Sequence, residues 1–274
     1  LVLDHGFVRV VDYMGNDESI AQSARVSIQK AEKRSSTEQL IRYMMSNRHS
    51  SPSEMAELCI HVKLPIFVAR QWVRHRTANI QEMSGRYSVL DNEFYIPEAS
   101  ELKTQATDNK QGRSDLLISP SASQDVMCML REDAMRNYDH YEGFLAAGLS
   151  RELARINLTL NYYTQWYWKI DLHNLLHFLS LRLDTHAQHE IRVYAQVIAD
   201  IVEAWVPFSW RAFMDYRFDA MTLNRMEIEV IGAAGLVGRM DATAITVLCL
   251  NKGMTQKEID KFMAKLKRLG GEKA

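Results

Sequence analysis

The sequence has few cysteines, and they form no recognisable motif. Its three cysteines, Cys59, Cys128 and Cys249, lie far apart, and there is no Cys-x-x-Cys pair. We therefore expect neither a disulfide framework nor a zinc ribbon, and a reducing, cytoplasmic setting is favoured. Apolar residues flank each cysteine. This pattern predicts buried structural thiols rather than a nucleophile.

Long apolar runs and an excess of charge of one sign are also lacking. No run approaches the roughly 18 apolar residues of a membrane span, and we expect no signal peptide. With 33 basic and 34 acidic residues, the formal net charge is −1. The field of the whole molecule therefore does not indicate binding to nucleic acid or to an anionic membrane. The length predicts one large domain, with or without a short appendage.

The distribution of apolar residues predicts a mixture of strands and helices. Strict alternation over residues 58–64 predicts a half-buried strand, and the aromatic run at 162–168 predicts another. Helical patterns surround these segments, so we expect an α/β or α+β fold. The polar stretch at 100–123 predicts a long excursion, either a lid or disordered. The last fifty or so residues predict a helical appendage, in which Thr255 and Glu258 form a capping box.

The most informative segment is residues 74–86, Arg-His-Arg-Thr-Ala-Asn-Ile-Gln-Glu-Met-Ser-Gly-Arg. It follows a predicted helix, which places it in a loop, where ligand-binding groups commonly lie. Arginine binds phosphate bidentately, and glycine lets backbone N–H groups approach a ligand. A solvated basic turn after a helix would explain the arginines, but not the carboxylate, hydroxyl and Gly-Arg that follow. We therefore predict a site for a ligand with several phosphates and a planar polar ring.

The segment resembles the RHR-x7-S signature of flavin-dependent thymidylate synthases, because Ser84 follows Arg74-His75-Arg76 after seven residues. The similarity covers roughly residues 4 to 218. Several ordered matches are more specific than one short pattern. The other matching segments are Gln71-Trp72, Ser84-Gly85-Arg86-Tyr87-Ser88, Arg151-Glu152-Leu153-Ala154-Arg155, Asn161, Leu179-Ser180-Leu181-Arg182, His186-Ala187-Gln188 and Glu190-Ile191.

This resemblance implies a fold and a reaction. The fold is α/β, with a central β-sheet flanked by long helices over residues 1–221 and a helical C-terminal extension at 222–274. The reaction is the reductive methylation of dUMP to dTMP, with 5,10-methylenetetrahydrofolate as carbon donor and FAD reduced by NADPH. The resemblance also implies a homotetramer with shared active sites. The cofactors would carry the hard chemistry, while the protein orients them and supplies electrostatics.

The resemblance implies which residues bind the nucleotide substrate. Arg86 and Arg155 would hold the nucleotide phosphate. Arg182 would be the catalytic residue: a guanidinium is no base at neutral pH, but it can stabilise the uracil anion left by loss of the N3 proton. We expect Arg155 and Arg182 to reach the segment across a subunit boundary. The residues assigned to dUMP are Gln71, Trp72, Arg74, Glu82, Ser84, Gly85, Arg86, Arg155 and Arg182.

The resemblance also assigns a flavin side. Some family members have Asn and Arg where this chain has Asp171 and His173. An acid facing a dinucleotide phosphate is unfavourable, so Asp171 is expected to contact a ribose or adenine, or only to cap its helix. The residues assigned to FAD are His49, Ser51, Glu54, Arg74, His75, Arg76, Glu82, Asp171, His173 and His177.

Two other functions stay open at this point. The first is a nucleic-acid-binding module that uses the arginines and aromatics, although the near-zero net charge speaks against it. The second is a metal-dependent nucleotide hydrolase that uses His173, His177, His186 and His189. His173 and His177 are one helical turn apart, as two zinc ligands can be. The sequence has no H-E-x-x-H motif and indicates no third ligand, so we expect no metal.

Overall fold

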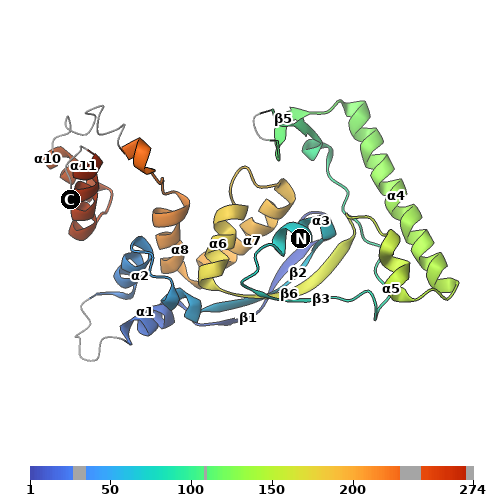
Figure 1. Cartoon of the computed structure of the whole chain (residues 1–274), viewed down its shortest axis with the longest axis horizontal. Helices are drawn as coiled ribbons and strands as arrows, with labels where there is room; N and C mark the ends of the chain where they lie inside the picture. Colours follow the sequence, from blue (N-terminus) through green and yellow to red (C-terminus); the bar gives the residue numbers. More distant parts are fainter. Residues whose placement is uncertain (27–34, 108–109, 229–241, 270–274) are drawn as a thin grey trace. The chain divides into compact units, whose positions relative to one another are not determined.

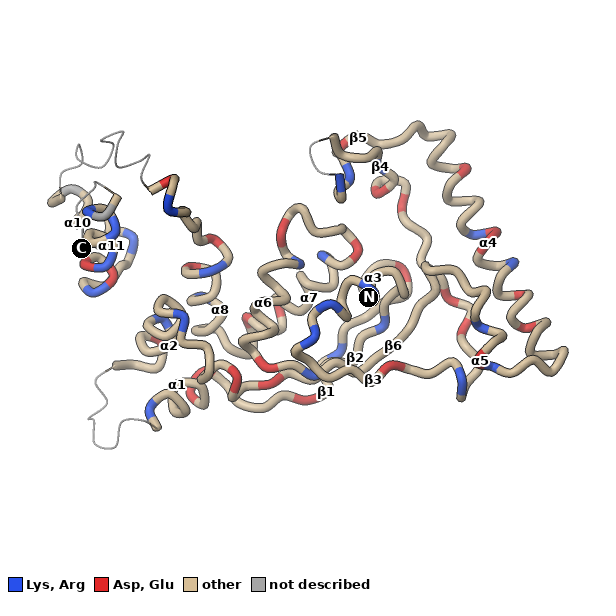
Figure 2. Tube along the Cα trace, in the orientation of Figure 1, with Lys and Arg blue, Asp and Glu red and all other residues tan. Residues whose placement is uncertain are grey.

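The computed structural model describes residues 1–26, 35–107, 110–228 and 242–269 (Figure 1). The chain divides into two compact units, Leu1–Asp219 and Ala220–Ala274. Parts of the predicted C-terminal extension, residues 229–241 and 270–274, lie outside the described residues. Basic and acidic residues are interspersed along most of the chain (Figure 2), as expected from the near-zero net charge.

The first unit is built on a four-stranded antiparallel sheet with strand order β1-β2-β6-β3. The strands are β1 (Phe7–Met14), β2 (Glu57–Pro65), β6 (Tyr163–Asp171) and β3 (Asn79–Glu82). The alternation predicted in β2 is observed, because Leu58, Ile60, Val62 and Leu64 are buried while the residues between them are partly exposed. The predicted mixed α/β class is therefore confirmed.

Helices and a separate hairpin complete this unit. The α-helices are α1 (Asp17–Arg25), α2 (Thr37–Ser46), α3 (Ile66–Trp72), α4 (Pro120–Ala146), α5 (Arg151–Ala154), α6 (Leu172–Arg182), α7 (His189–Trp205) and α8 (Pro207–Phe213). Short 3₁₀-helices are η1 (Ser51–Met55), η2 (Ala99–Glu101) and η3 (Arg155–Asn157), and η4 (Met214–Phe218) is a π-helical turn. The hairpin pairs β4 (Lys103–Gln105) with β5 (Arg113–Leu117).

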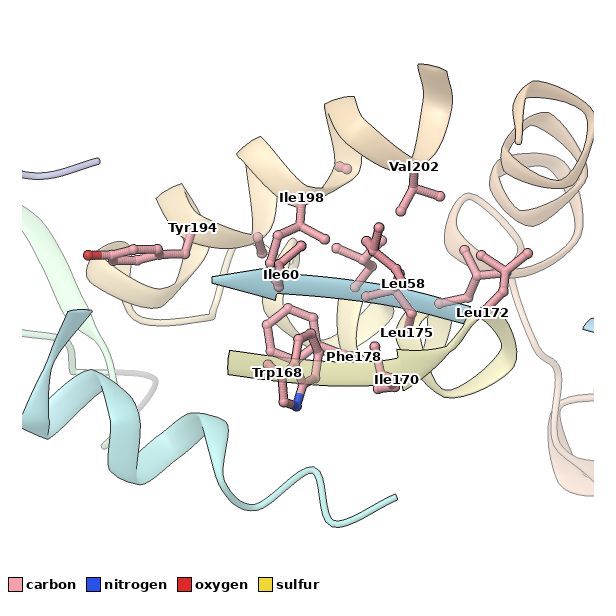
Figure 3. Packing of buried hydrophobic residues seen from close by; sticks show 14 of the residues in the cluster. Leu58, Ile60, Trp168, Ile170, Leu172, Leu175, Phe178, Tyr194, Ile198 and Val202 are labelled. Carbon is pink, nitrogen blue, oxygen red and sulfur yellow. The ribbon is translucent and has the colours of Figure 1, made fainter. Parts of the chain in front are cut away.

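The main core lies between the sheet and helices α3, α6 and α7 (Figure 1). Figure 3 shows Leu58 and Ile60 of β2 close to Ile198 of α7. The Trp72 ring of α3 lies 5.1 Å from that of Trp168, and Trp72 is fully buried. Truncating a buried tryptophan typically costs about 3–5 kcal/mol. Trp72 therefore anchors the end of α3, where the predicted site begins. This placement differs from the predicted contact with substrate, because the side chain lies in the core.

A smaller core supports the loop that follows the predicted site. Tyr138 and Tyr141 of α4 pack with Leu90 and Phe94. The Tyr141 hydroxyl accepts a hydrogen bond from the Leu90 backbone N–H (3.1 Å), and the Tyr138 hydroxyl donates to the Leu90 carbonyl (2.8 Å). Helix α4 therefore holds the backbone of Leu90 in place, in the loop that follows Gly85.

Three expectations from the sequence are wrong in whole or in part. The described part of the stretch at 100–123 is not disordered, because it contains the β4–β5 hairpin, and a role as a lid stays a prediction. The segment at 74–86 is not entirely loop, because Asn79–Glu82 pairs with β6 as an edge strand. Cys128 is exposed rather than buried, because α4 turns it toward solvent, where its thiol donates to Glu132 Oε1 (3.2 Å).

The second unit contains α10 (Ala242–Asn251) and α11 (Gln256–Leu269), which pack through Ile245, Cys249 and Ile259. The predicted capping box is confirmed: the Thr255 backbone N–H donates to Glu258 Oε2 (2.8 Å), and the Glu258 N–H donates to Thr255 Oγ1 (3.4 Å). Among the helices of the described ranges, none is long and apolar enough to cross a membrane.

Candidate active site

The centre of the site is a contact between His75 and Arg182. Arg182 Nε donates to His75 Nε2 (3.1 Å), and Arg182 Nη2 donates to the Gln71 carbonyl (3.3 Å). Arg182 is the last residue of α6, Gln71 lies in the last turn of α3, and His75 follows that helix. Two hydrogen bonds therefore hold the guanidinium in one orientation, as preorganised charge stabilisation requires.

The contact also sets the protonation state of His75. Burial, the nearby Arg182 charge and His177 lower the pKa of His75 to about 4. The imidazole is therefore neutral near pH 7, and Nε2 is the acceptor because Arg182 donates to it. Burial also lowers the pKa of Arg182, but a guanidinium stays charged at neutral pH. The site thus presents one partly desolvated positive charge beside a neutral ring.

A hydrogen-bonded chain extends from this centre to the β4–β5 hairpin. The Gln71 side chain donates to Gln188, and Gln188 Nε2 donates to Glu190 Oε2 (2.8 Å). Glu190 is buried, and Arg113 Nη2 of β5 donates to the same oxygen (2.6 Å). A buried carboxylate needs such partners, so Arg113 and Glu190 fix the far end of the chain. Sequence reasoning gave neither residue a role.

One cavity has a volume of about 460 Å³, and we call it the histidine cavity. Three residues predicted to bind flavin line it: His49, His173 and His177. The other lining residues are Ile41, Met44, Met45, Arg48, Ser50, Ser53, Leu176, Ser180, Phe213 and Arg217. Among these described residues there is no Asp or Glu. The lining therefore has the chemistry of a site for a ligand that carries phosphate.

Several predicted flavin residues lie outside this lining. Ser51 and Glu54 belong to η1 beside the cavity and are exposed. Asp171 caps α6, where its carboxylate accepts from the Asn174 backbone N–H (3.0 Å) and from Asn174 Nδ2 (2.7 Å). Arg74 and Arg76 are exposed and line neither this cavity nor the one described next. A flavin contact for these residues stays a prediction.

A second cavity, of about 350 Å³, contains residues predicted to bind nucleotide, and we call it the Gly85 cavity. Glu82 Oε1 accepts a hydrogen bond from Thr164 Oγ1 (2.6 Å), which orients the carboxylate. A Cβ atom on Gly85 would lie 3.2 Å from Arg155 Cδ, so the glycine lets the arginine stem pack on the backbone. The lining residues are Ile66, Arg70, Glu82, Met83, Gly85, Leu90, Glu152, Arg155, Ile156, Leu158, Thr159, Leu160, Tyr162 and Thr164.

Ser84 and Arg86 flank this cavity without lining it. Ser84 Oγ accepts from the Arg86 backbone N–H (3.4 Å) and, at 3.5 Å, from Arg86 Nε. The Arg86 side chain is exposed, and its guanidinium lies over Tyr87, with Cζ 5.5 Å from the ring centroid. Both Ser84 and Arg86 are therefore available to a ligand at the edge of the Gly85 cavity.

The structure corrects one expectation about assembly of the site. Arg182 reaches His75, and Arg155 reaches Gly85, within a single chain. Neither arginine has to cross a subunit boundary to join residues 74–86. Sequence reasoning missed Arg48, Arg70 and Arg217 as cavity residues, because no local pattern distinguishes them from other surface arginines.

The histidines do not gather into a metal centre in the described ranges. There, no group of three or more His, Cys, Asp or Glu side chains could hold a metal ion. His173 and His177, one helical turn apart on α6, both line the histidine cavity instead.

Comparisons with known proteins agree with this geometry. The family model for thymidylate synthase complementing protein matches residues 9–208. The chain is 53% identical over 269 residues to a flavin-dependent thymidylate synthase of Gluconobacter oxydans, covering 97% of this chain and 86% of that protein. It is 55% identical over 231 residues to one of Wolbachia pipientis, covering 84% of this chain and 81% of that protein.

A solved structure has the same fold. The UMP/dUMP methylase PolB from Streptomyces cacaoi, in a crystal structure bound with 5-Br UMP, superposes with a TM-score of 0.71 at 29% identity. The match covers 79% of this chain and 97% of that one. Together with the sequence matches, this likeness shows that the chain belongs to the family of flavin-dependent thymidylate synthases.

Proposed function

We propose that this flavin-dependent thymidylate synthase converts dUMP to dTMP, with 5,10-methylenetetrahydrofolate as carbon donor and NADPH as reductant of FAD. The names of its relatives support the flavin and the thymidylate product. The uridine nucleotide in the related methylase structure supports a pyrimidine nucleotide as substrate. Bound FAD supplies the hydride that the reductive methylation needs.

The observation that carries the proposal is the pair of hydrogen bonds that holds Arg182 against His75 and Gln71. Methylation at C5 of uracil requires a more electron-rich ring, and loss of the N3 proton provides it. A fixed, partly desolvated guanidinium stabilises the resulting anion more strongly than mobile water does. Because the His75 pKa is about 4, its imidazole does not compete for this anion as a second cation.

The two cavities suit the two ligands. The histidine cavity, with five basic side chains and no carboxylate among its described lining residues, fits a flavin dinucleotide with its pyrophosphate. Its volume of about 460 Å³ also falls in the range of ligand pockets, roughly 300–1,000 Å³. The Gly85 cavity suits dUMP, with Arg155 on the phosphate and Glu82 available to a ribose hydroxyl or the base.

The active unit is residues 1–221, and residues 222–274 are an extension to it. Every residue that lines the two cavities lies between Ile41 and Arg217, which supports this division. We also infer that the working enzyme is a homotetramer with shared sites. Arg74, Arg76 and Arg86 are exposed in the single chain, and further copies would bring ligand groups to them.

The test is spectroscopic and then chemical. Purified protein should show the absorption of a bound flavin, and NADPH should bleach it faster when dUMP is present. With methylenetetrahydrofolate added, dTMP should form, and omission of dUMP serves as the control. A protein that neither carries nor takes up flavin would rule out the proposal, and so would one that reduces flavin but makes no dTMP from dUMP.

A further inference from the structure

Two arginines outside the predicted flavin residues line the histidine cavity, and each occupies an unusual backbone position. Arg48 has φ 61°, in the left-handed region that favours glycine. Arg217 lies in the π-helical turn η4. Irregular backbone of both kinds is concentrated at functional sites in proteins.

Arg48 occupies a backbone position at the end of a helix where glycine is usual. Helix α2 ends in a Schellman motif: the His49 N–H donates to the Met44 carbonyl (2.9 Å), and the Arg48 N–H donates to the Met45 carbonyl (3.3 Å). The residue in this place is usually glycine, because only glycine adopts the left-handed conformation without a steric penalty. An arginine near a helix C-terminus gains from the helix dipole, but a residue in the last helical turn would gain the same without strain. A functional contact of the Arg48 side chain would offset this penalty.

The charges of the two arginines are not neutralised within the described part of the chain. Arg42 forms an ion pair with Asp215, the acidic residue of the π-helical turn, at 2.5 Å. No acidic side chain there is paired with Arg48 or Arg217. Burial and the nearby charge of Arg48 lower the pKa of Arg217, so the two guanidinium groups repel each other. Two like charges at one cavity favour a ligand group with at least two negative charges.

We propose that Arg48 and Arg217 form an anion subsite of the histidine cavity that binds the pyrophosphate of the flavin dinucleotide. The proposal rests on the proposed function, which places FAD in this cavity. The two guanidinium groups supply a permanent positive charge to this lining, and the capping role of Asp171 keeps its carboxylate bound to Asn174.

The test measures affinity for three flavins that differ in phosphate. Full-length protein, stripped of flavin, is titrated with FAD, FMN and riboflavin, and the flavin fluorescence is followed. A charge-assisted hydrogen bond contributes enough that Arg48→Gln and Arg217→Gln should each weaken FAD binding about 10-fold or more. The double variant should lose about 100-fold, while riboflavin binding should be unchanged. Arg211→Gln is the matched control, because Arg211 lies outside the cavity lining and pairs with Glu38.

Arg48→Gly separates the binding role from a structural one. Glycine removes the charge but relieves the left-handed strain, so this variant should melt at the wild-type temperature or higher and still bind FAD about 10-fold more weakly. If it binds FAD as tightly as the wild type, Arg48 is not part of the subsite.

Each remaining outcome decides between the proposals. If wild-type protein binds no FAD, the proposed function fails. If wild type binds FAD and the double variant binds it equally well, only the subsite fails. An equal loss for riboflavin and FAD would mean that the arginines shape the cavity without binding phosphate, which also overturns the subsite. A raised KM for NADPH with unchanged FAD affinity would overturn it too, by assigning the arginines to the nicotinamide dinucleotide instead of the flavin.

Discussion

The two cavities differ in how their charges are balanced. The histidine cavity has three histidines and two arginines, and no carboxylate among its described lining residues. In the Gly85 cavity, Arg70 and Arg155 are accompanied by Glu82 and Glu152. An unbalanced positive lining attracts a ligand with several negative charges. A mixed lining is selective for a ligand with one phosphate and several hydrogen-bonding groups, because each wrong partner leaves a polar group unpaired.

The Arg182–His75 pair belongs to neither lining, and α3 and α6 hold it in place. Binding and chemistry are therefore assigned to different residues. If this division holds, single substitutions can impair flavin binding, nucleotide binding or turnover separately.

The substitution that should separate turnover from flavin binding most clearly is Arg182→Ala. Removing a fixed group that stabilises an anion typically lowers the rate by about 10²–10³-fold. We expect kcat to fall by at least that factor while flavin affinity changes less than about 3-fold, since Arg182 does not line the histidine cavity. Single-turnover formation of dTMP and a flavin titration measure the two quantities.

A lysine at position 182 refines this test, because it keeps the charge but cannot reach both His75 and Gln71. Its rate should lie between those of Arg182→Ala and wild type. Arg192→Ala on α7 is the control and should be near wild type, because the Arg192 guanidinium donates to the Thr185 carbonyl, away from His75 and Gln71. Undiminished dTMP formation by Arg182→Ala would remove the assigned role.

Gly85→Ala should weaken the binding of dUMP without weakening the binding of flavin. The added Cβ would lie 3.0 Å from Leu90 Cδ1 and 3.2 Å from Arg155 Cδ, so the arginine stem must move. A misplaced charge-assisted hydrogen bond corresponds to about a 10-fold rise in KM for dUMP, with flavin affinity unchanged. Steady-state kinetics at saturating NADPH measure this rise.

Gly143→Ala is the matched control for that substitution. Gly143 lies within α4, and beyond the helix's own backbone no described atom lies within 4 Å of the place that an alanine Cβ would take. Alanine there should be neutral or slightly stabilising. An unchanged KM for dUMP in Gly85→Ala would show that Arg155 does not depend on this packing. A loss of flavin affinity in that variant would break the separation between the two cavities.

The His75–Arg182 pair predicts a pH dependence of stability. Because the pKa of His75 falls from 6.5 to about 4 on folding, the unfolded chain takes up the proton first as the pH decreases. The contribution of His75 to the free energy of unfolding is therefore fully present above pH 6.5 and is lost as the pH falls from 6.5 to about 4. His75→Gln keeps a hydrogen-bond acceptor but does not titrate. The stability advantage of wild type over this variant should narrow by about 1–2 kcal/mol between roughly pH 7 and pH 4.5, after allowance for solvent screening.

Urea unfolding followed by tryptophan fluorescence at several pH values measures this difference. The sequence has nine histidines, and those other than His75 are common to both proteins, so their titration cancels. A constant difference across the pH range would mean that the pKa of His75 is the same in the folded and the unfolded protein, so that the contact with Arg182 does not hold the imidazole in its neutral form.

The sequence predicted the elements whose signal is local. The alternation from Leu58 to Leu64 predicted β2, because one face of that strand packs on α6 and α7. It did not predict β3, because Asn79–Glu82 is exposed throughout and is held by the backbone of β6 rather than by burial of side chains. The β4–β5 hairpin was missed for the same reason, since its anchor is the distant pair Arg113–Glu190.

The candidate site, too, was predictable from the sequence only where its signal is local. Residues 74–86 were identified because their chemistry is concentrated in one segment. The resemblance supplied Arg182, but only the fold shows that it bonds to His75. Arg48 and Arg217 come from separate segments and become one feature only through tertiary packing.

The smallest expected effect concerns Asp171, a carboxylate assigned to the flavin side that the structure places in a helix cap. As the N-cap of α6 it accepts from the Asn174 N–H, and loss of such a cap costs about 1 kcal/mol. Asp171→Ala should therefore lower the free energy of unfolding by about that amount, whereas Asp171→Asn, which keeps the capping oxygen, should change it by roughly a few tenths. Flavin affinity should be the same in wild type and Asp171→Asn, because the carboxylate charge is used for the helix and not for the ligand. A marked change of flavin affinity in Asp171→Asn, without a change in stability, would instead place a carboxylate at the histidine cavity and remove the contrast between the two linings.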